Sequence, residues 1–220
     1  MKKHIFINKI NIIILFNLLF IIDLCSAQQT WNFRNPSFEG IPRAGRVPKD
    51  WSNCNQNNDT SPADTEPAGQ FEVTRAANDG LTYLGLITRA DGSKERVGQK
   101  LNMALIAGKT YQISMYLYCS DEKRSATNAS QMQRPYVKLS FTSPTFLRCW
   151  GGFSLCDNSE VLFESPLIQH RNWGKYTFTF KPTKAYNTIM FEANHNPKNS
   201  FENGNLMIDN LSAIELIEEK

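Results

Sequence analysis

The chain has 220 residues, of which 41% are hydrophobic and 20% charged, and its formal net charge is +3. A balance this close to neutral implies no nucleic acid or other polyanion as a partner. Without residues 1–27, the leader described next, 21 basic and 20 acidic residues remain, on a chain long enough for one domain with a substantial core.

The first 27 residues have the pattern of a secretory signal peptide. Three lysines within the first nine residues precede an apolar run over 10–22. That run is shorter than the roughly 20 residues that a helix needs to span a bilayer, which argues against a retained anchor. The small residues Cys25 and Ala27 predict cleavage after Ala27. Lipidation of Cys25 is the weaker alternative, because Leu24 departs from the small residue expected there. We therefore expect a secreted protein, extracellular or at the cell surface.

Four cysteines remain after cleavage, and an even number in an oxidising compartment favours disulfides. Cys149 and Cys156 flank a short Gly-Gly loop, so their pairing is the simplest of the three possible connectivities. It leaves Cys54 with Cys119. A structural zinc site is the alternative, but the chain has no CxxC pair and few histidines.

From residue 70 onward, short segments of alternating apolar and polar residues are separated by Gly, Pro, Asn and Asp clusters. This pattern predicts strands and no sustained helix. The turn at 78–80 predicts a hairpin between segments at 70–74 and 81–88. Further strands are predicted over 109–120, 136–142, 175–180, 189–194 and 206–216, whereas 42–69 and 120–134 are polar and predict loops.

The strand over 109–120 has the clearest alternation, with Tyr111, Ile113 and Leu117 on one face and Gln112, Ser114 on the other. About eight to ten strands of this kind must bury their apolar faces against a second sheet. The sequence therefore predicts an all-β fold, a two-sheet jelly-roll β-sandwich over residues 28–220.

Short motifs near the two ends resemble a known fold. Asn35-Pro36-Ser37-Phe38-Glu39 and Leu206-Met207-Ile208-Asp209-Asn210-Leu211 resemble the paired terminal strands of galactose-binding-like jelly rolls. Pro48-x-x-Trp51 and Gly80-x-x-Tyr83-x-Gly85 are similar to segments of the same domains. These include bacterial carbohydrate-binding modules and N-terminal domains of secreted surface proteins linked to gliding.

The resemblance implies a structural calcium ion beside the first and last strands, held by Glu39 and Asp209. Calcium takes six to eight oxygen ligands, so Ser37 and the turn that contains Asp79 and Thr82 are expected to complete the set. The alternative is that Glu39 and Asp209 are exposed strand-end residues or pair with a lysine.

A sugar site needs flat aromatic rings and fixed polar groups. The polar face of the strand over 109–120 offers Gln112, Tyr116 and Tyr118. Neighbouring strands add the following residues if their polar faces line the same surface: Tyr136, Glu192 and Asn194. Trp150, beside Cys149 in the Gly-Gly loop, is a second binding candidate. The alternative for each aromatic residue is packing beneath a loop.

Motifs of catalysis are missing from the sequence: it has no nucleophile elbow, metal-binding His-Glu-x-x-His helix, phosphate loop or dinucleotide fingerprint. Glycoside hydrolysis needs two carboxylates, and Glu192 and Glu72 are the clearest strand-borne acids. The sequence favours a non-catalytic module that binds a glycan or polysaccharide and a structural calcium ion. The alternatives are an adhesion or structural domain that binds a cell-envelope protein, and a glycan hydrolase or lyase.

Overall fold

The computed structural model describes residues 29–56, 61–126 and 138–217. The leader, its predicted cleavage site and Tyr136 lie outside these ranges. Within them the regular elements are strands, apart from a single 3-10 turn, η1 (Gln70–Glu72). None of the described residues forms a helix with the length and apolar character needed to cross a membrane.

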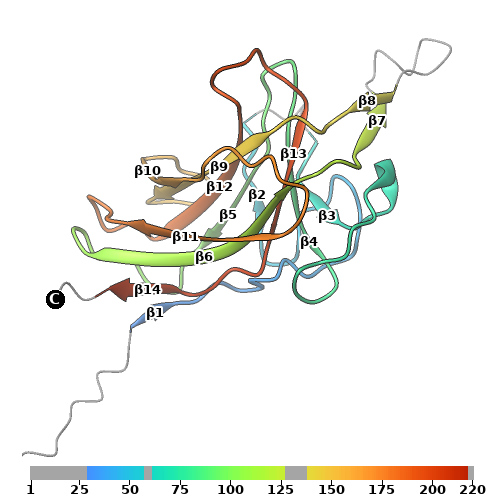
Figure 1. Cartoon of the computed structure of the whole chain (residues 1–220). Coiled ribbons are helices and arrows are strands. Elements are labelled where there is room, and N and C mark those ends of the chain that lie inside the picture. Colours follow the sequence, from blue (N-terminus) through green and yellow to red (C-terminus); the bar gives the residue numbers. More distant parts are fainter. Residues whose placement is uncertain (1–28, 57–60, 127–137, 218–220) are drawn as a thin grey trace, which may run out of the picture.

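The strands form two antiparallel sheets that pack face to face as a sandwich (Figure 1). The seven-stranded sheet has the order β1 (Thr30–Trp31), β14 (Ile214–Ile217), β6 (Thr110–Cys119), β13 (Gly204–Asp209), β4 (Tyr83–Thr88) and β3 (Asp64–Glu66), and β11 (Gly174–Phe180) also pairs with β6. The five-stranded sheet has the order β10 (Glu160–Glu164), β9 (Thr145–Gly152), β12 (Thr188–His195), β5 (Arg96–Lys100) and β2 (Ser52–Asn53). A separate hairpin of β7 (Arg124–Ala126) and β8 (Lys138–Ser140) projects from the sandwich. The predicted all-β sandwich is confirmed.

The core lies between the inner faces of the two sheets and follows the predicted alternation. On β6, Tyr111, Ile113 and Leu117 are buried, whereas Gln112 and Ser114 between them are partly exposed. Rings from the two sheets meet there, and the parallel rings of Phe163 and Phe178 have centroids 4.4 Å apart. Each fully buried apolar side chain of this size contributes about 1.5–3 kcal/mol to folding, so alternation alone specifies which face turns inward.

The two ends of the described chain lie side by side, as predicted, but the paired strands are not the two motifs: residues 35–39 form no strand, and β13 pairs with β4 and β6. β1 pairs with β14, with Thr30 opposite Glu215 and Trp31 opposite Ile214. Trp31 is fully buried, and its indole Nε1 donates to the carbonyl of Ala104 at 3.0 Å. These contacts close the seven-stranded sheet at one edge.

Several predicted elements differ in the structure. The predicted loops over 42–69 and 120–134 contain the short strands β2, β3 and β7, and Trp150, predicted in a loop, lies within β9. The predicted hairpin at 78–80 is wrong, because residues 70–72 form η1 and β4 begins only at Tyr83. Phe71 and Glu72 have left-handed backbone angles, with φ of 56° and 71°, which a strand cannot contain. The predicted final strand is divided into β13 and β14, because Asn210 also has a positive φ of 53° and turns the chain.

The predicted disulfide pairs are wrong. Cys54 is bonded to Cys156, whereas Cys119 and Cys149 are free and buried. Cys149 lies within β9 and points into the core, while Cys156 follows the end of that strand. Cys149 faces the core because alternate side chains of β9 point inward, whereas Cys156 lies in the loop after the strand, so the two cysteines do not pair although they are close in sequence.

Candidate functional site

The outer face of the five-stranded sheet carries two adjacent rows of side chains in register. One row, which we call the apolar row, contains Val161, Trp150, Met190 and Gly98. The next, which we call the charged row, contains Glu164, Arg148, Glu192 and Arg96. Residues directly opposite on neighbouring strands lie about 5 Å apart, so each row runs across four strands.

Trp150 is the centre of the apolar row and is held on two sides. Its indole Nε1 donates to Glu192 Oε2 at 2.6 Å. The Arg148 guanidinium lies 5.3 Å from the ring centroid, within the range of a cation–π contact. Val161 beside it is 40% exposed. The tryptophan is therefore a partly exposed ring whose orientation is fixed before any ligand arrives.

Glu192 is the centre of the charged row and is almost completely buried. Its Oε1 accepts from Lys94 Nζ at 2.5 Å and from Arg96 Nη2 at 3.2 Å, and Lys94 also donates to Asn194 Oδ1 at 2.9 Å. Burial alone raises the pKa of Glu192, but the hydrogen bond from Lys94 and the charges of Lys94 and Arg96 outweigh it and hold the pKa below its usual value. Glu192 is thus an ionised anchor for its neighbours.

Arg148 connects the two rows. Its Nε donates to Glu164 Oε1 at 2.5 Å, and its guanidinium plane covers part of Trp150. The terminal Nη groups make no hydrogen bond to any residue in the described ranges, so their N–H donors remain available to a ligand.

The predicted binding residues are divided between opposite faces of the sandwich. Trp150, Glu192 and Asn194 lie on the outer face of the five-stranded sheet. Gln112, Tyr116 and Tyr118 follow β6, on the outer side of the seven-stranded sheet. The condition on which Glu192 and Asn194 were added to the residues of β6 is therefore not met, because β6 and β12 belong to different sheets whose outer faces point away from each other.

Tyr118 is covered by chain and is not a surface residue. Its side chain is 1% exposed, its hydroxyl lies 3.1 Å from that of Tyr83, and the Trp173 ring packs edge-on with centroids 4.5 Å apart. Burial raises the pKa of Tyr118 far above its ordinary value. The segment over 73–78, which we call the strap, completes this cover through buried Val73.

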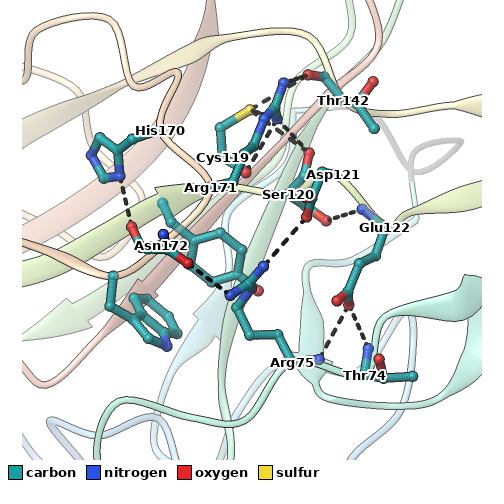
Figure 2. A network of polar contacts seen from close by, with 12 residues as sticks. Thr74, Arg75, Cys119, Ser120, Asp121, Glu122, Thr142, His170, Arg171 and Asn172 are labelled. Atoms are coloured by element: carbon teal, nitrogen blue, oxygen red, sulfur yellow. Dashed lines mark hydrogen bonds and ion pairs between the residues drawn. The ribbon is translucent and has the colours of Figure 1, made fainter.

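A polar network fixes the strap in place (Figure 2). Glu122 Oε2 accepts from the backbone N–H groups of Thr74 and Arg75 at 2.7 and 3.1 Å. Arg75 Nη1 donates to Asn172 Oδ1 at 3.2 Å, and its Nη2 lies 3.6 Å from Asp121 Oδ1. The Arg75 guanidinium also lies 5.1 Å from the Tyr118 ring centroid. The strap therefore covers the part of the outer face of the seven-stranded sheet that carries Tyr118.

The two histidines of the domain make structural hydrogen bonds. His170 Nδ1 lies 2.7 Å from the carbonyl of Asn172, and its Nε2 lies 2.8 Å from the Tyr176 hydroxyl (Figure 2 shows the first contact). His195 Nε2 lies 2.8 Å from the carbonyl of Arg89. Neither ring contacts a serine or cysteine nucleophile in the described ranges.

The five predicted calcium ligands surround the turn over 78–82. Asp209 Oδ2 accepts from the backbone N–H groups of Asn78 and Asp79 at 2.8 and 2.9 Å. Glu39 Oε1 accepts from those of Leu81 and Thr82 at 2.9 and 3.3 Å. Ser37 Oγ donates to Asp79 Oδ2, and Thr82 Oγ1 donates to the carbonyl of Phe38 at 3.0 Å.

The donor chemistry of this cluster fits calcium, because every side chain offers oxygen. Asp209 is fully buried, and burial raises its pKa to about 7. In the described ranges, no lysine or arginine forms an ion pair with Glu39, Asp79 or Asp209. The same ranges contain no group of three acidic, histidine or cysteine side chains already converged on a metal position. The carboxylate oxygens of Glu39 and Asp209 instead accept hydrogen bonds from backbone N–H groups of the turn.

Sequence reasoning missed Arg148, Arg96, Lys94 and Met190, which complete the candidate site. Phe146, Arg148 and Trp150 alternate with buried residues along β9, so the signal for a shared outer face was present. The sequence did not show which strands lie beside β9.

No protein-family model matches the sequence, and no curated protein is similar to it in sequence. Solved structures do resemble the fold. The Stig cyclase Fisc from Fischerella sp. TAU, in complex with an indole derivative, has a TM-score of 0.52 at 10% identity, over 88% of this chain and all of that one. An arabinose-bound α-L-arabinofuranosidase, MgGH51, has a TM-score of 0.51 at 12% identity, over 87% of this chain and 27% of the enzyme.

A family 16 carbohydrate-binding module is also similar, with a TM-score of 0.39 at 14% identity, over 71% of this chain and 86% of the module. At identities this low, the similarity to solved structures supports the fold and nothing further. The chain has an all-β sandwich fold of the jelly-roll type.

Proposed function

We propose that this protein is a non-catalytic carbohydrate-binding module whose site is the outer face of the five-stranded sheet around Trp150. The observation that carries the proposal is the apolar row beside the charged row. A pyranose has an apolar C–H face and a rim of hydroxyls, so a ring and fixed charged groups side by side match both of its surfaces.

Each row supplies one half of that match. Trp150 and Val161 offer partly exposed apolar surface. Arg148 offers N–H donors, and its neighbour Glu164, 43% exposed at the side chain, offers acceptor oxygens. Because Trp150 is already held by Glu192 and Arg148, little conformational entropy is lost when a ligand stacks on it.

The ionisation of the site supports binding over hydrolysis. A glycosidase needs one carboxylic acid that delivers a proton to the leaving group. Glu192 has a lowered pKa and two cationic partners, and Glu164 is paired with Arg148. Glu192 therefore lacks the protonated state that a general acid requires, and Glu164 already has a cationic partner.

Affinity electrophoresis in native gels that contain xylan, β-glucan, mannan or pectin tests the proposal. Trp150→Ala should lower the affinity for the polysaccharide that retards the native protein by 10-fold or more, whereas Tyr116→Ala should leave it unchanged. Tyr116 is a matched control because it is a partly exposed aromatic residue on the other sheet. Retardation that survives Trp150→Ala, or that is absent for the native protein in every gel, contradicts the proposal.

An adhesion role is the second candidate, and one observation favours it. Phe153, Leu155 and Val161 are 50%, 46% and 40% exposed, so apolar surface is concentrated around the β9–β10 connection. Exposed apolar patches commonly mark protein interfaces. A cell-envelope protein bound through this edge would be released by Phe153→Asp in a pull-down, while polysaccharide retardation would be absent.

We also infer that the protein works outside the cytosol and binds calcium. The Cys54–Cys156 disulfide supports an oxidising compartment, and mass spectrometry of the exported protein should find an N-terminus at Gln28. Calcium would be held by Glu39, Asp79 and Asp209, with oxygens from Ser37 and Thr82. Its role would be to neutralise carboxylates that have no cationic partner in the described ranges.

Thermal unfolding in calcium and in EGTA tests the metal. At a free concentration of 100 times the dissociation constant, a bound ion adds about 2.7 kcal/mol to the free energy of unfolding. Asp209→Asn should abolish the difference between the two conditions, and Asp91→Asn, at an exposed turn, should preserve it. Identical melting of the native protein in calcium and in EGTA would exclude a stabilising site.

A further inference from the structure

The loop over 153–157, which we call the pinned loop, crosses the outer face of the five-stranded sheet. It follows β9, and its Cys156 is bonded to Cys54, which comes directly after β2 at the far edge of the sheet. Strands β12 and β5 lie between β9 and β2. The loop therefore covers one end of the face that carries Trp150.

Leu155 is the residue of the loop that lies over the apolar row. A Cβ atom placed on Gly98 would lie 3.5 Å from Leu155 Cδ1 and 2.9 Å from Cys54 Sγ. Gly98 is the last member of the apolar row, opposite Met190. The glycine lets both the disulfide and Leu155 approach the sheet at this position, so Leu155 extends the row beyond Trp150.

Hydrogen bonds also hold the loop rigid. Thr188 Oγ1 donates to the carbonyl of Ser154 at 2.9 Å. The backbone N–H of Phe153 donates to Asp157 Oδ2 at 2.8 Å, and that of Asp157 donates to the carbonyl of Ser154 at 3.1 Å. Cys156 has a φ of 68°, a conformation that non-glycine residues adopt where the surrounding structure imposes it.

The apolar side chains of the pinned loop nevertheless remain in solvent. Leu155 is 46% exposed, although it lies against the sheet. A loop that is ordered by a disulfide and three hydrogen bonds, and that still presents apolar surface, has the properties of a binding loop on a rigid scaffold.

We propose that the pinned loop forms one wall of the ligand surface, that Leu155 contacts the ligand, and that the Cys54–Cys156 disulfide is the element that positions it. This inference rests on the proposed carbohydrate-binding function. It adds a specificity-determining contact outside the two rows and makes binding dependent on the oxidation state. Reduction by a dithiol converts the bond into two thiols, while the dithiol itself becomes a cyclic disulfide.

The test uses the polysaccharide gels described above. Leu155→Ala should weaken retardation three- to ten-fold, whereas Ile41→Ala, which removes an aliphatic side chain that is 64% exposed, should not change it. Dithiothreitol should weaken retardation of the native protein to a similar extent and have no further effect on Leu155→Ala. Chymotrypsin should cleave after Phe153 or Leu155 only in the reduced protein.

The outcomes separate the two proposals. If Trp150→Ala abolishes retardation while Leu155→Ala and reduction leave it unchanged, the function stands and the wall is overturned. If the native protein is not retarded in any gel, the proposed function fails and the wall fails with it. Circular dichroism of the reduced protein checks that the sandwich is intact, and Leu155→Ala provides the same test with the disulfide in place.

Discussion

Glu66 is a buried carboxylate whose ionisation should set part of the pH dependence of stability. It lies on the outer side of β3, fully buried, beside Asp64 and 3.7 Å from Lys123 Nζ. Burial, together with the charge of Asp64, raises the pKa of Glu66 from 4.5 to about 7, although Lys123 opposes the shift. One of its oxygens, Oε1, accepts no hydrogen bond. We predict that Glu66→Gln removes this dependence.

The sign follows from proton binding. Between pH 4.5 and 7 the folded protein keeps a proton on Glu66 that the unfolded chain has released. The free energy of unfolding therefore decreases as the pH rises through this window. Each unit of pKa difference corresponds to about 1.4 kcal/mol, so the full loss is about 3 kcal/mol. Glutamine, which does not titrate, should be more favourable relative to glutamate at pH 8 than at pH 4.5.

Urea unfolding followed by tryptophan fluorescence at pH 4.5, 6 and 8 measures the effect. The difference in free energy of unfolding between Glu66→Gln and the native protein should increase by about 3 kcal/mol from the lowest to the highest pH. Burial also raises the pKa of Glu95, to about 8, but this group is present in both proteins. A difference that stays constant with pH would refute the reasoning.

Three other substitutions test particular contacts by thermal or urea unfolding. Gly80→Ala should lower the free energy of unfolding by at least about 2 kcal/mol, because φ is 66° at this position and the new Cβ would clash with Glu39 Oε1. Melting like that of the native protein would contradict this prediction. Asn205→Leu should stabilise the protein by about 1 kcal/mol, because both amide atoms of Asn205 are buried without a partner; a loss would show that they are satisfied by water. Lys123→Met should cost about 3–5 kcal/mol by leaving Asp64 buried beside Glu66 without its cation, and a neutral effect would show that the pair is not desolvated.

The inner faces of the sheets could be predicted from the sequence because burial imposes a period of two. On β6 and β12 the apolar residues that alternate in the sequence are the ones that form the core. The adjacent chain ends were also predictable, since the motifs at 35–39 and 206–211 both resemble terminal segments of a known fold. In both cases a local pattern was enough.

The outer faces could not be predicted in the same way. Tyr118 and Trp150 both occupy outward positions on their strands, but the strap covers one and leaves the other partly exposed. That difference depends on contacts between residues far apart in sequence, such as Glu122 with Arg75. The partner of Cys156 was hidden for the same reason, because 102 residues separate it from Cys54.

The pairing of β1 with β14 has a consequence for how the domain can be attached to other molecules. Thr30 and Glu215 are direct neighbours, so a tether at either end of the described chain leaves the sandwich at the same place. That place is the edge of the seven-stranded sheet, whereas Trp150 is on the other sheet. A short peptide joining residues 217 and 29 would give a circular permutant, with new ends cut in an exposed loop and the tryptophan surface left unobstructed.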